Sequence, residues 1–172
     1  AIVLSKEHNL TLEQKFDKSL YRCAYKTGNY FLAKTTAAKH LKDKEERLQW
    51  LYNYAKTLNK SGQYEELTKV ASDVITLSEM EKTSEYDDIL QDLFSAYERL
   101  GNTQGMIKTV KELEKRRGLE YDDIEIYVSM IKLGLKENDD IIIETYADKV
   151  MALQEKTNSY SQSPFVEFSA LQ

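Results

Sequence analysis

The sequence is poor in the residues that interrupt or crosslink a polypeptide chain. Its 172 residues include one proline, six glycines and one cysteine. So little proline and glycine suits long helices joined by few sharp turns. The lone Cys23 excludes a disulfide within the chain, and it is typical of a reducing compartment or of a cysteine-poor periplasmic protein. The cysteine count therefore leaves the compartment open between the cytoplasm and the periplasm.

Long apolar runs and the usual signatures of catalysis are also missing. No apolar run approaches the roughly 20 residues of a membrane-spanning helix, and no charged-then-apolar leader opens the sequence, so we expect no targeting segment. Glycine-rich phosphate loops and nucleophile elbows are absent. His8 and His40 have no partners at ligand spacing. We expect no metal, no cofactor and no enzymatic activity.

Three pairs of adjacent acids are the remaining candidates for carboxylate chemistry, namely Asp87-Asp88, Asp122-Asp123 and Asp139-Asp140. Each pair stands where a helix is expected to begin. Acidic side chains at that position stabilise the helix dipole. We therefore interpret all three pairs as structural.

What the chain does contain is helical periodicity interrupted by a recurring turn. The turns are Gly28-Asn29, Gly62-Gln63, Gly101-Asn102 and Asn138-Asp139, spaced 34, 39 and 37 residues apart. Such spacing is typical of stacked helix pairs. We predict an all-α chain of about four antiparallel helical hairpins, at about residues 11–42, 44–79, 84–117 and 122–156.

The remaining segments flank these hairpins. We interpret residues 1–10 as an N-terminal segment or the end of a preceding helix, and residues 157–163 as a polar linker. Residues 164–172 carry Phe165, Phe168 and Leu171 at helical spacing, which predicts the start of a further or capping helix.

Apolar residues at three- and four-residue steps identify the expected core. For the first helix these are Leu12, Phe16, Leu20, Cys23 and Ala24, and for the second hairpin Leu48, Leu51, Ala55, Leu58, Leu67, Val70, Ala71, Val74 and Ile75. Cys23 is thereby expected to be a small buried apolar residue.

At these turns the sequence resembles the tetratricopeptide repeat family. Gly28-Asn29-Tyr30 followed by Ala33 and Ala37, and Gly62-Gln63-Tyr64 followed by Ala71, fit the family's turn and small-residue positions. The later two turns lack the tyrosine, the family's glycine in the first helix is replaced throughout, and its terminal proline is missing. The resemblance, over about residues 11–156, implies an α-solenoid. An irregular all-helical domain is the alternative.

The same resemblance implies that the first helices of successive hairpins line a groove that binds another protein. Its positions transfer to Lys18, Arg22, Tyr25, Lys26, Tyr52, Asn53 and Lys56, with Gln91, Ser95, Glu98 and Arg99 from the third hairpin. Tyrosines and cations on one wall suit an acidic or aromatic segment. A chaperone-type carboxylate clamp is not expected, because Asp88 and Asp92 stand where cations are needed. The alternative is that these are ordinary exposed residues.

Charge is unevenly distributed along the chain. Residues 1–60 hold twelve Lys and Arg against six Asp and Glu, a net charge of +6, whereas the remaining residues carry a net charge of −11. One interpretation of this uneven charge is that the charged residues lie on solvated helix faces. The other is that the basic end of the molecule meets an acidic partner or the acidic end of another copy. Only the first third is basic, which argues against nucleic acid as a partner.

Taken together, these features predict a non-catalytic protein–protein interaction scaffold or adaptor segment of a larger bacterial protein. Its composition resembles that of helical-repeat scaffolds of envelope machines, including the periplasmic paralysed-flagellum proteins of the flagellar motor. Two alternatives remain open: a peptide-binding sensor or regulatory repeat domain, and a helical-repeat appendage of an enzyme.

Overall fold

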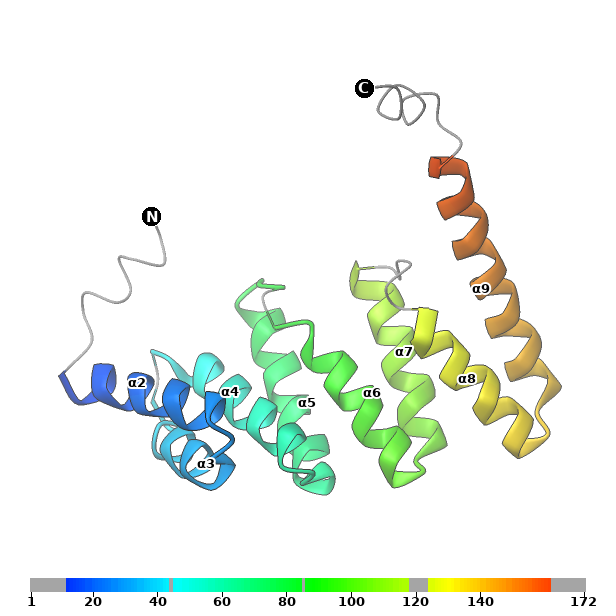
Figure 1. The fold of residues 1–172 in the computed structure, drawn as a ribbon. Helices are drawn as coiled ribbons and strands as arrows, with labels where there is room; N and C mark the ends of the chain where they lie inside the picture. Colours follow the sequence, from blue (N-terminus) through cyan, green and yellow to red (C-terminus); the bar gives the residue numbers. More distant parts are fainter. Residues whose placement is uncertain (1–11, 44, 85, 118–123, 162–172) are drawn as a thin grey trace, which may run out of the picture. The chain divides into compact units, whose positions relative to one another are not determined.

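The secondary structure of the described residues is helical, as the sequence periodicity predicts. The computed structural model describes residues 12–43, 45–84, 86–117 and 124–161, and these contain eight helices and no strand. The all-α class is therefore confirmed (Figure 1). Among these residues, no helix is both long and apolar enough to cross a membrane. The chain divides after Gly101 into two compact units, residues 1–101 and residues 102–172.

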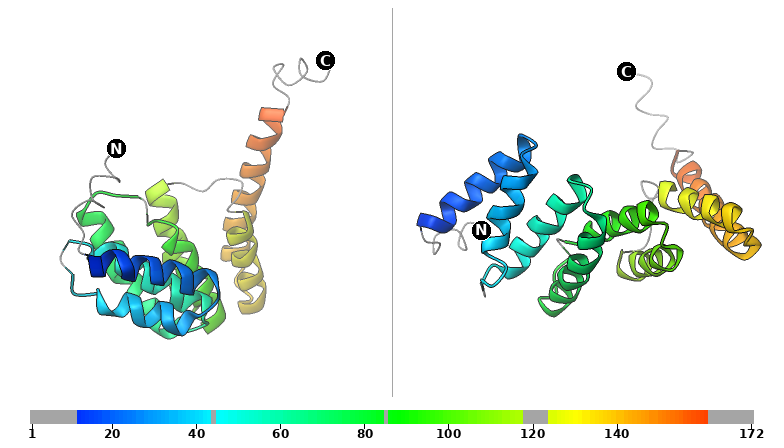
Figure 2. Two further views of the ribbon diagram at one scale, coloured as in Figure 1. Left: turned by 60° about the vertical axis from the view of Figure 1, so that its left-hand side comes forward. Right: turned by 90° about the horizontal axis from the view of Figure 1, so that it is seen from below.

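The described residues of the first unit form five helices that pack in chain order. They are α2 (Leu12–Lys26), α3 (Tyr30–Lys39), α4 (Arg47–Lys60), α5 (Tyr64–Met80) and α6 (Ile89–Leu100). Each helix packs against the next, and α4 also contacts α6 (Figure 2). This sequential packing is consistent with the predicted helical hairpins formed by α2 with α3 and by α4 with α5.

The second unit contains α7 (Thr103–Arg117), α8 (Ile124–Glu137) and α9 (Asp140–Ser161). Helix α8 packs against α7 and, more extensively, against α9. The hairpin predicted at residues 84–117 falls across the division between the units, because α6 belongs to the first and α7 to the second.

One backbone device ends a helix at each of the four turns found in the sequence. One residue of each turn adopts a left-handed conformation, with φ of 76° at Gly28, 72° at Gly62, 65° at Gly101 and 53° at Asn138. The following helix begins two residues later, at Tyr30, Tyr64, Thr103 and Asp140 respectively. Side-chain oxygens of Asn29, Asn102 and Asp139 accept hydrogen bonds from the amides three residues on, those of Leu32, Gly105 and Ile142. These caps satisfy amides that the helix itself leaves unpaired.

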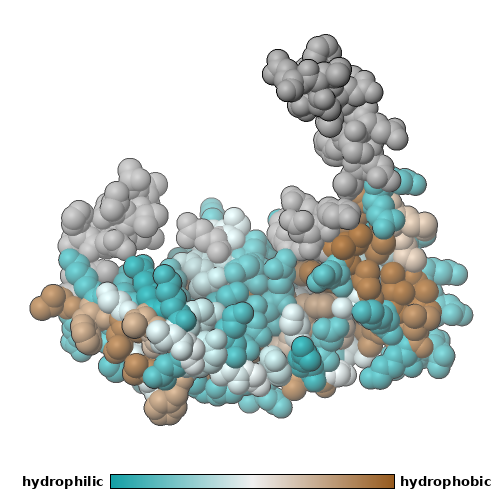
Figure 3. Space-filling view, in the orientation of Figure 1, coloured by the Kyte–Doolittle hydropathy of each residue, from teal (hydrophilic) through white to brown (hydrophobic). Residues whose placement is uncertain are grey.

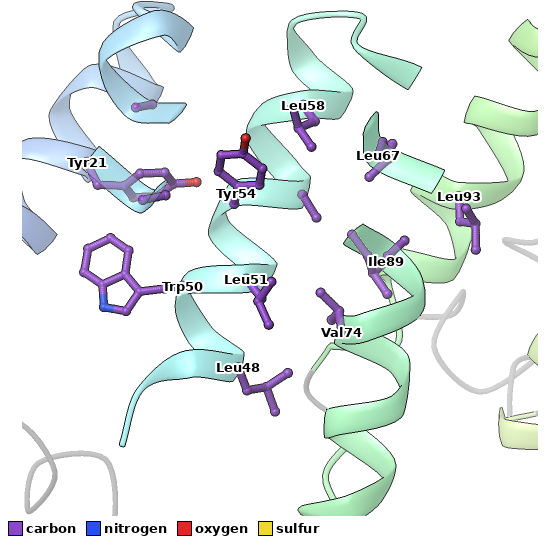
Figure 4. Close-up of a cluster of buried hydrophobic side chains, with 14 of the residues drawn as sticks. Tyr21, Leu48, Trp50, Leu51, Tyr54, Leu58, Leu67, Val74, Ile89 and Leu93 are labelled. Atoms are coloured by element: carbon purple, nitrogen blue, oxygen red, sulfur yellow. The ribbon is translucent and has the colours of Figure 1, made fainter. Parts of the chain in front are cut away.

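The core of the first unit is centred on α4, which lies between α3, α5 and α6. Trp50, Leu58 and Leu67 are fully buried there, and Figure 4 shows Leu51 and Leu58 pointing towards Leu67, Val74 and Ile89. All four residues predicted for the core face of α4 are buried, as are three of the five predicted for α5. A strong helical period therefore located this core correctly.

For α2 the predicted core face is wrong. Leu12 is 86% exposed and Phe16 is 64% exposed, and Cys23 is exposed as well. The buried residues of α2 are instead Asp17, Tyr21 and Ala24, so that Ala24 alone of the predicted five is fully buried.

Polar partners on the neighbouring helices decide which face of α2 turns inward. The Asp17 carboxylate lies 2.9 Å from His40 Nε2 and 3.6 Å from Lys39 Nζ, and the Tyr21 hydroxyl bonds to α4. A buried polar group is tolerated when its hydrogen bonds are met. The period of apolar residues carries no information about such partners.

Helix α9 is longer than the sequence indicated. It continues to Ser161, so residues 157–161, which we expected to begin a linker, are helical. Polar residues such as Thr157 and Ser159 lower helix propensity only slightly, and residues 139–163 contain no glycine or proline. The expected N-terminal segment, the capping helix, Asp122-Asp123 and His8 lie outside the described residues.

Candidate partner-binding surface

Helices α2, α4 and α6 of the first unit are joined by side-chain contacts along one face. The Tyr21 hydroxyl donates to the Asn53 carbonyl across 2.9 Å, linking α2 to α4. The Tyr52 hydroxyl donates to Asp88 Oδ2 across 2.7 Å, linking α4 to the start of α6. We call this face the first-helix wall; its side chains are Lys18, Arg22, Tyr25, Lys26, Tyr52, Asn53, Lys56, Asn59, Asp88, Gln91, Asp92, Ser95 and Glu98.

Tyr21 is a buried residue of α2 that holds this helix against α4. Its ring is buried and packs edge-on against Trp50 at 6.1 Å between centroids. Burial raises the pKa of Tyr21 to about 12, although the hydrogen bond with Thr57 opposes this change. The hydroxyl therefore stays protonated at neutral pH and remains a donor to α4.

Lys56 occupies the middle of the wall, between two carboxylates. Its Nζ lies 2.7 Å from Asp92 Oδ2 and 3.2 Å from Asp88 Oδ2. Burial lowers the pKa of Lys56, but hydrogen bonds and charge from the two carboxylates outweigh burial, and the net pKa is raised. The Asn59 amide also donates to Asp92, across 2.6 Å. Lys56 is thus a charged part of the α4–α6 packing.

Tyr52 completes this cluster. Its ring lies 4.9 Å from the ring of Tyr86 between centroids, and Lys56 Nζ lies 5.8 Å from the Tyr52 ring centroid. Burial, followed by the hydrogen bond and charge of Asp88, raises the pKa of Tyr52. Tyr52 therefore remains a neutral donor to a carboxylate.

The α2 end of the wall has a different character. Lys18 is paired with Glu46 across 2.6 Å, whereas the side chains of Arg22 and Lys26 are exposed. Tyr25 is half-buried, stacked on Tyr21 at 5.7 Å between centroids. Exposed cations next to an aromatic ring make this end suited to an acidic or aromatic group.

The structure brings some of the predicted residues together and gives others a packing role. Burial raises the pKa of the Tyr25 hydroxyl, and the positive charge of Lys56 partly opposes this rise. The Asn53 side chain accepts a hydrogen bond from Gln49 across 3.2 Å. Lys18 and Lys56 face carboxylates, and Arg22 and Lys26 stand at exposed positions of the wall.

Three residues of the cluster were left out of the predicted site: Asn59, Asp88 and Asp92. Their contacts with α4 or α6 join positions 32 to 36 residues apart. This separation is close to the turn-to-turn spacing of the sequence. A search of the sequence for complementary side chains one repeat apart would therefore have identified them.

The chemistry available on this surface is recognition by charge, hydrogen bonds and aromatic contact. No group of three residues suited to hold a metal ion occurs among the residues that the structure describes. A comparison with known protein families finds no match to this chain, and a comparison with curated proteins finds none either. The surface itself must therefore support any functional conclusion.

Proposed function

We propose that this chain is an α-solenoid segment of tetratricopeptide-like hairpins and that it acts as a non-catalytic scaffold or adaptor for another protein. The observation that carries the proposal is recurrence: the same left-handed turn follows a helix at Gly28, Gly62, Gly101 and Asn138, and within each unit neighbouring helices pack in chain order. A repeat that buries its apolar face only against its neighbours is the basis of a solenoid.

A three-residue clamp between helices supports the repeat interpretation. In the first unit, Lys34 Nζ of α3 lies 5.6 Å from the Tyr54 ring centroid on α4 and 2.6 Å from Glu66 Oε2 on α5. The Tyr54 hydroxyl donates to the other oxygen of Glu66 across 2.5 Å. One tyrosine and one ion pair thereby join three consecutive helices.

The second unit contains the same clamp with the charges exchanged. Lys149 Nζ of α9 lies 5.6 Å from the Tyr127 ring centroid on α8 and is paired with Glu114 of α7. The Tyr127 hydroxyl donates to Glu114 Oε1 across 2.9 Å. In both units the clamp joins the second helix of one hairpin to both helices of the next hairpin. This is expected if both units use one packing scheme.

The first-helix wall is the surface that we propose binds the partner. Its exposed cations Arg22 and Lys26 adjoin the half-buried Tyr25, and its α6 side carries Asp88 and Glu98. A segment of another protein with an acidic or aromatic residue over α2 complements this distribution.

The test is capture of partners from the native cell extract by the wild-type chain and by a wall variant, followed by mass spectrometry. The wall variant is Arg22→Ala/Gln91→Ala/Ser95→Arg, at three exposed helical positions. The control is Lys69→Ala/Ser72→Arg/Thr76→Ala, at exposed positions of α5. Both variants keep the net charge of the wild type, and circular dichroism checks their helix content.

A partner that is held by wild type and control but lost by the wall variant supports the proposal. A partner retained equally by all three chains moves the binding surface away from the wall. Turnover of a substrate through residues of this segment contradicts the non-catalytic role.

A further inference from the structure

The outward face of α2 combines cations with uncovered apolar side chains. Lys15, Arg22 and Lys26 are exposed, and at helical spacing they form a row alongside Leu12 and Phe16, whose exposures are 86% and 64%. Figure 3 shows apolar surface at the start of α2. Among the exposed residues of α2, Glu13 is the single acid.

The outward face of α9 has the opposite charge. Glu144, Asp148 and Glu155 are exposed along it, together with Ile141 and Met151, which are 77% and 54% exposed. No lysine or arginine is exposed on the described side chains of α9, residues 140–155. Apolar surface is visible over α8 and α9 in Figure 3.

The two charged rows match in spacing when the helices run in opposite directions. From Lys26 the cations of α2 follow at steps of four and seven residues, and from Glu144 the acids of α9 follow at the same steps. At about 1.5 Å per residue, each row spans roughly 16 Å. Antiparallel helices in contact would therefore place Lys26 opposite Glu144, Arg22 opposite Asp148, and Lys15 opposite Glu155.

We propose that α2 of one copy of this chain packs antiparallel against α9 of a second copy. Opposite charges along both helices steer this approach, and exposed apolar residues such as Phe16 and Met151 supply contact area beside the charges. This interface shares Arg22 and Lys26 with the first-helix wall, but it requires no protein other than a second copy of this chain.

Such an interface joins two different surfaces, so in a pair of copies one keeps its α9 face unused and the other keeps its α2 face unused. Contacts of this heterologous kind produce rings or open chains. Individual exposed ion pairs contribute little and are screened by salt. The association is accordingly expected to strengthen with protein concentration and to weaken as the salt concentration rises.

Charge reversal tests the pairing by sedimentation velocity at low and high salt. The α2 variant is Lys15→Glu/Arg22→Glu/Lys26→Glu, and the α9 variant is Glu144→Lys/Asp148→Lys/Glu155→Lys. Each variant alone is expected to be monomeric where wild type associates. An equimolar mixture of the two variants is expected to associate again, because the α2 face of each then meets the oppositely charged α9 face of the other.

Matched controls separate pairing from net charge. Lys69→Glu/Lys108→Glu/Lys111→Glu changes the net charge as the α2 variant does, and Glu65→Lys/Asp73→Lys/Glu81→Lys changes it as the α9 variant does, all at exposed positions. Controls that associate like wild type, together with recovery in the mixture, support the proposal. The proposal is overturned if wild type stays monomeric at every concentration, which is also the result expected if residues 1–11 or 162–172 cover these faces. It is likewise overturned if the mixture of variants fails to associate.

Discussion

The ammonium group of Lys56 lies 2.7 Å from the carboxylate of Asp92, across the packing between α4 and α6. Both side chains are largely buried, and Asn59 donates to the same carboxylate. A cation that we expected to face a partner protein is therefore used to join two neighbouring helices.

Replacing Lys56 with methionine is expected to destabilise the first unit by about 1–3 kcal/mol, because Asp92 and Asp88 would lose their shared cation. Chemical unfolding followed by far-UV circular dichroism measures the change. Lys60→Met, at an exposed position of the same helix, is the control and should change the free energy of unfolding by less than about 0.5 kcal/mol. An equally small effect at Lys56 would contradict the packing role.

The clamp at Glu66 predicts a loss of stability in acid. Hydrogen bonds from Lys34 and then Tyr54 hold the pKa of Glu66 below its usual 4.5. A carboxyl group with a lowered folded-state pKa stabilises the fold above the unfolded pKa, and this contribution disappears as the pH falls through the lowered value. Wild type should therefore be more stable than Glu66→Gln at pH 7, and the difference should shrink in unfolding measurements below about pH 4.5. A difference that does not vary with pH would exclude this role for the carboxylate.

Tyr21 predicts a loss of stability in alkali. Burial raises its pKa from 10.0 to about 12, so the protonated phenol stabilises the fold below pH 10 and this contribution is lost as the pH rises towards 12. At neutral pH, Tyr21→Phe should cost about 1 kcal/mol through the lost bond to the Asn53 carbonyl. The stability gap between wild type and Tyr21→Phe should close between pH 10 and 12, and comparing the two chains cancels the titration of the lysines.

Gly62 predicts a purely conformational cost on substitution. Its φ is 72°, and a Cβ at this position would meet no atom within 4 Å. Gly62→Ala should therefore cost about 1 kcal/mol through backbone strain alone. Asparagine occupies the equivalent turn position at Asn138, so Gly62→Asn should cost less than Gly62→Ala. Thermal unfolding of the two variants decides the order.

Gly134 predicts a steric cost instead. A Cβ there would lie 2.8 Å from Ile143 Cγ1 and 3.1 Å from the Asp139 carbonyl oxygen. Gly134→Ala should destabilise the α8–α9 hairpin by about 1–3 kcal/mol, despite the better helix propensity of alanine. Lys132→Ala, at an exposed position of the same helix, is the control. If Gly134→Ala is neutral, the helices can separate at this turn without cost.

The sequence by itself determined the helices and the turns between them, because these depend on local physics. Left-handed conformations at Gly28 and Gly62 are favoured by the missing side chain, and Asn29 follows as a helix cap. The buried residues of α4 could also be predicted from the sequence, because a single apolar stripe runs along that helix.

Tertiary structure alone decided which face of α2 is buried and which cations remain exposed. Helix α2 carries an apolar stripe on one face and Asp17 and Tyr21 on another, and the second face is buried because α3 and α4 supply its hydrogen-bond partners. Lys56 could likewise be assigned to the packing only once Asp92 was placed beside it. A charge becomes a structural or a binding group according to its neighbours, and neighbours distant in the chain are set by packing.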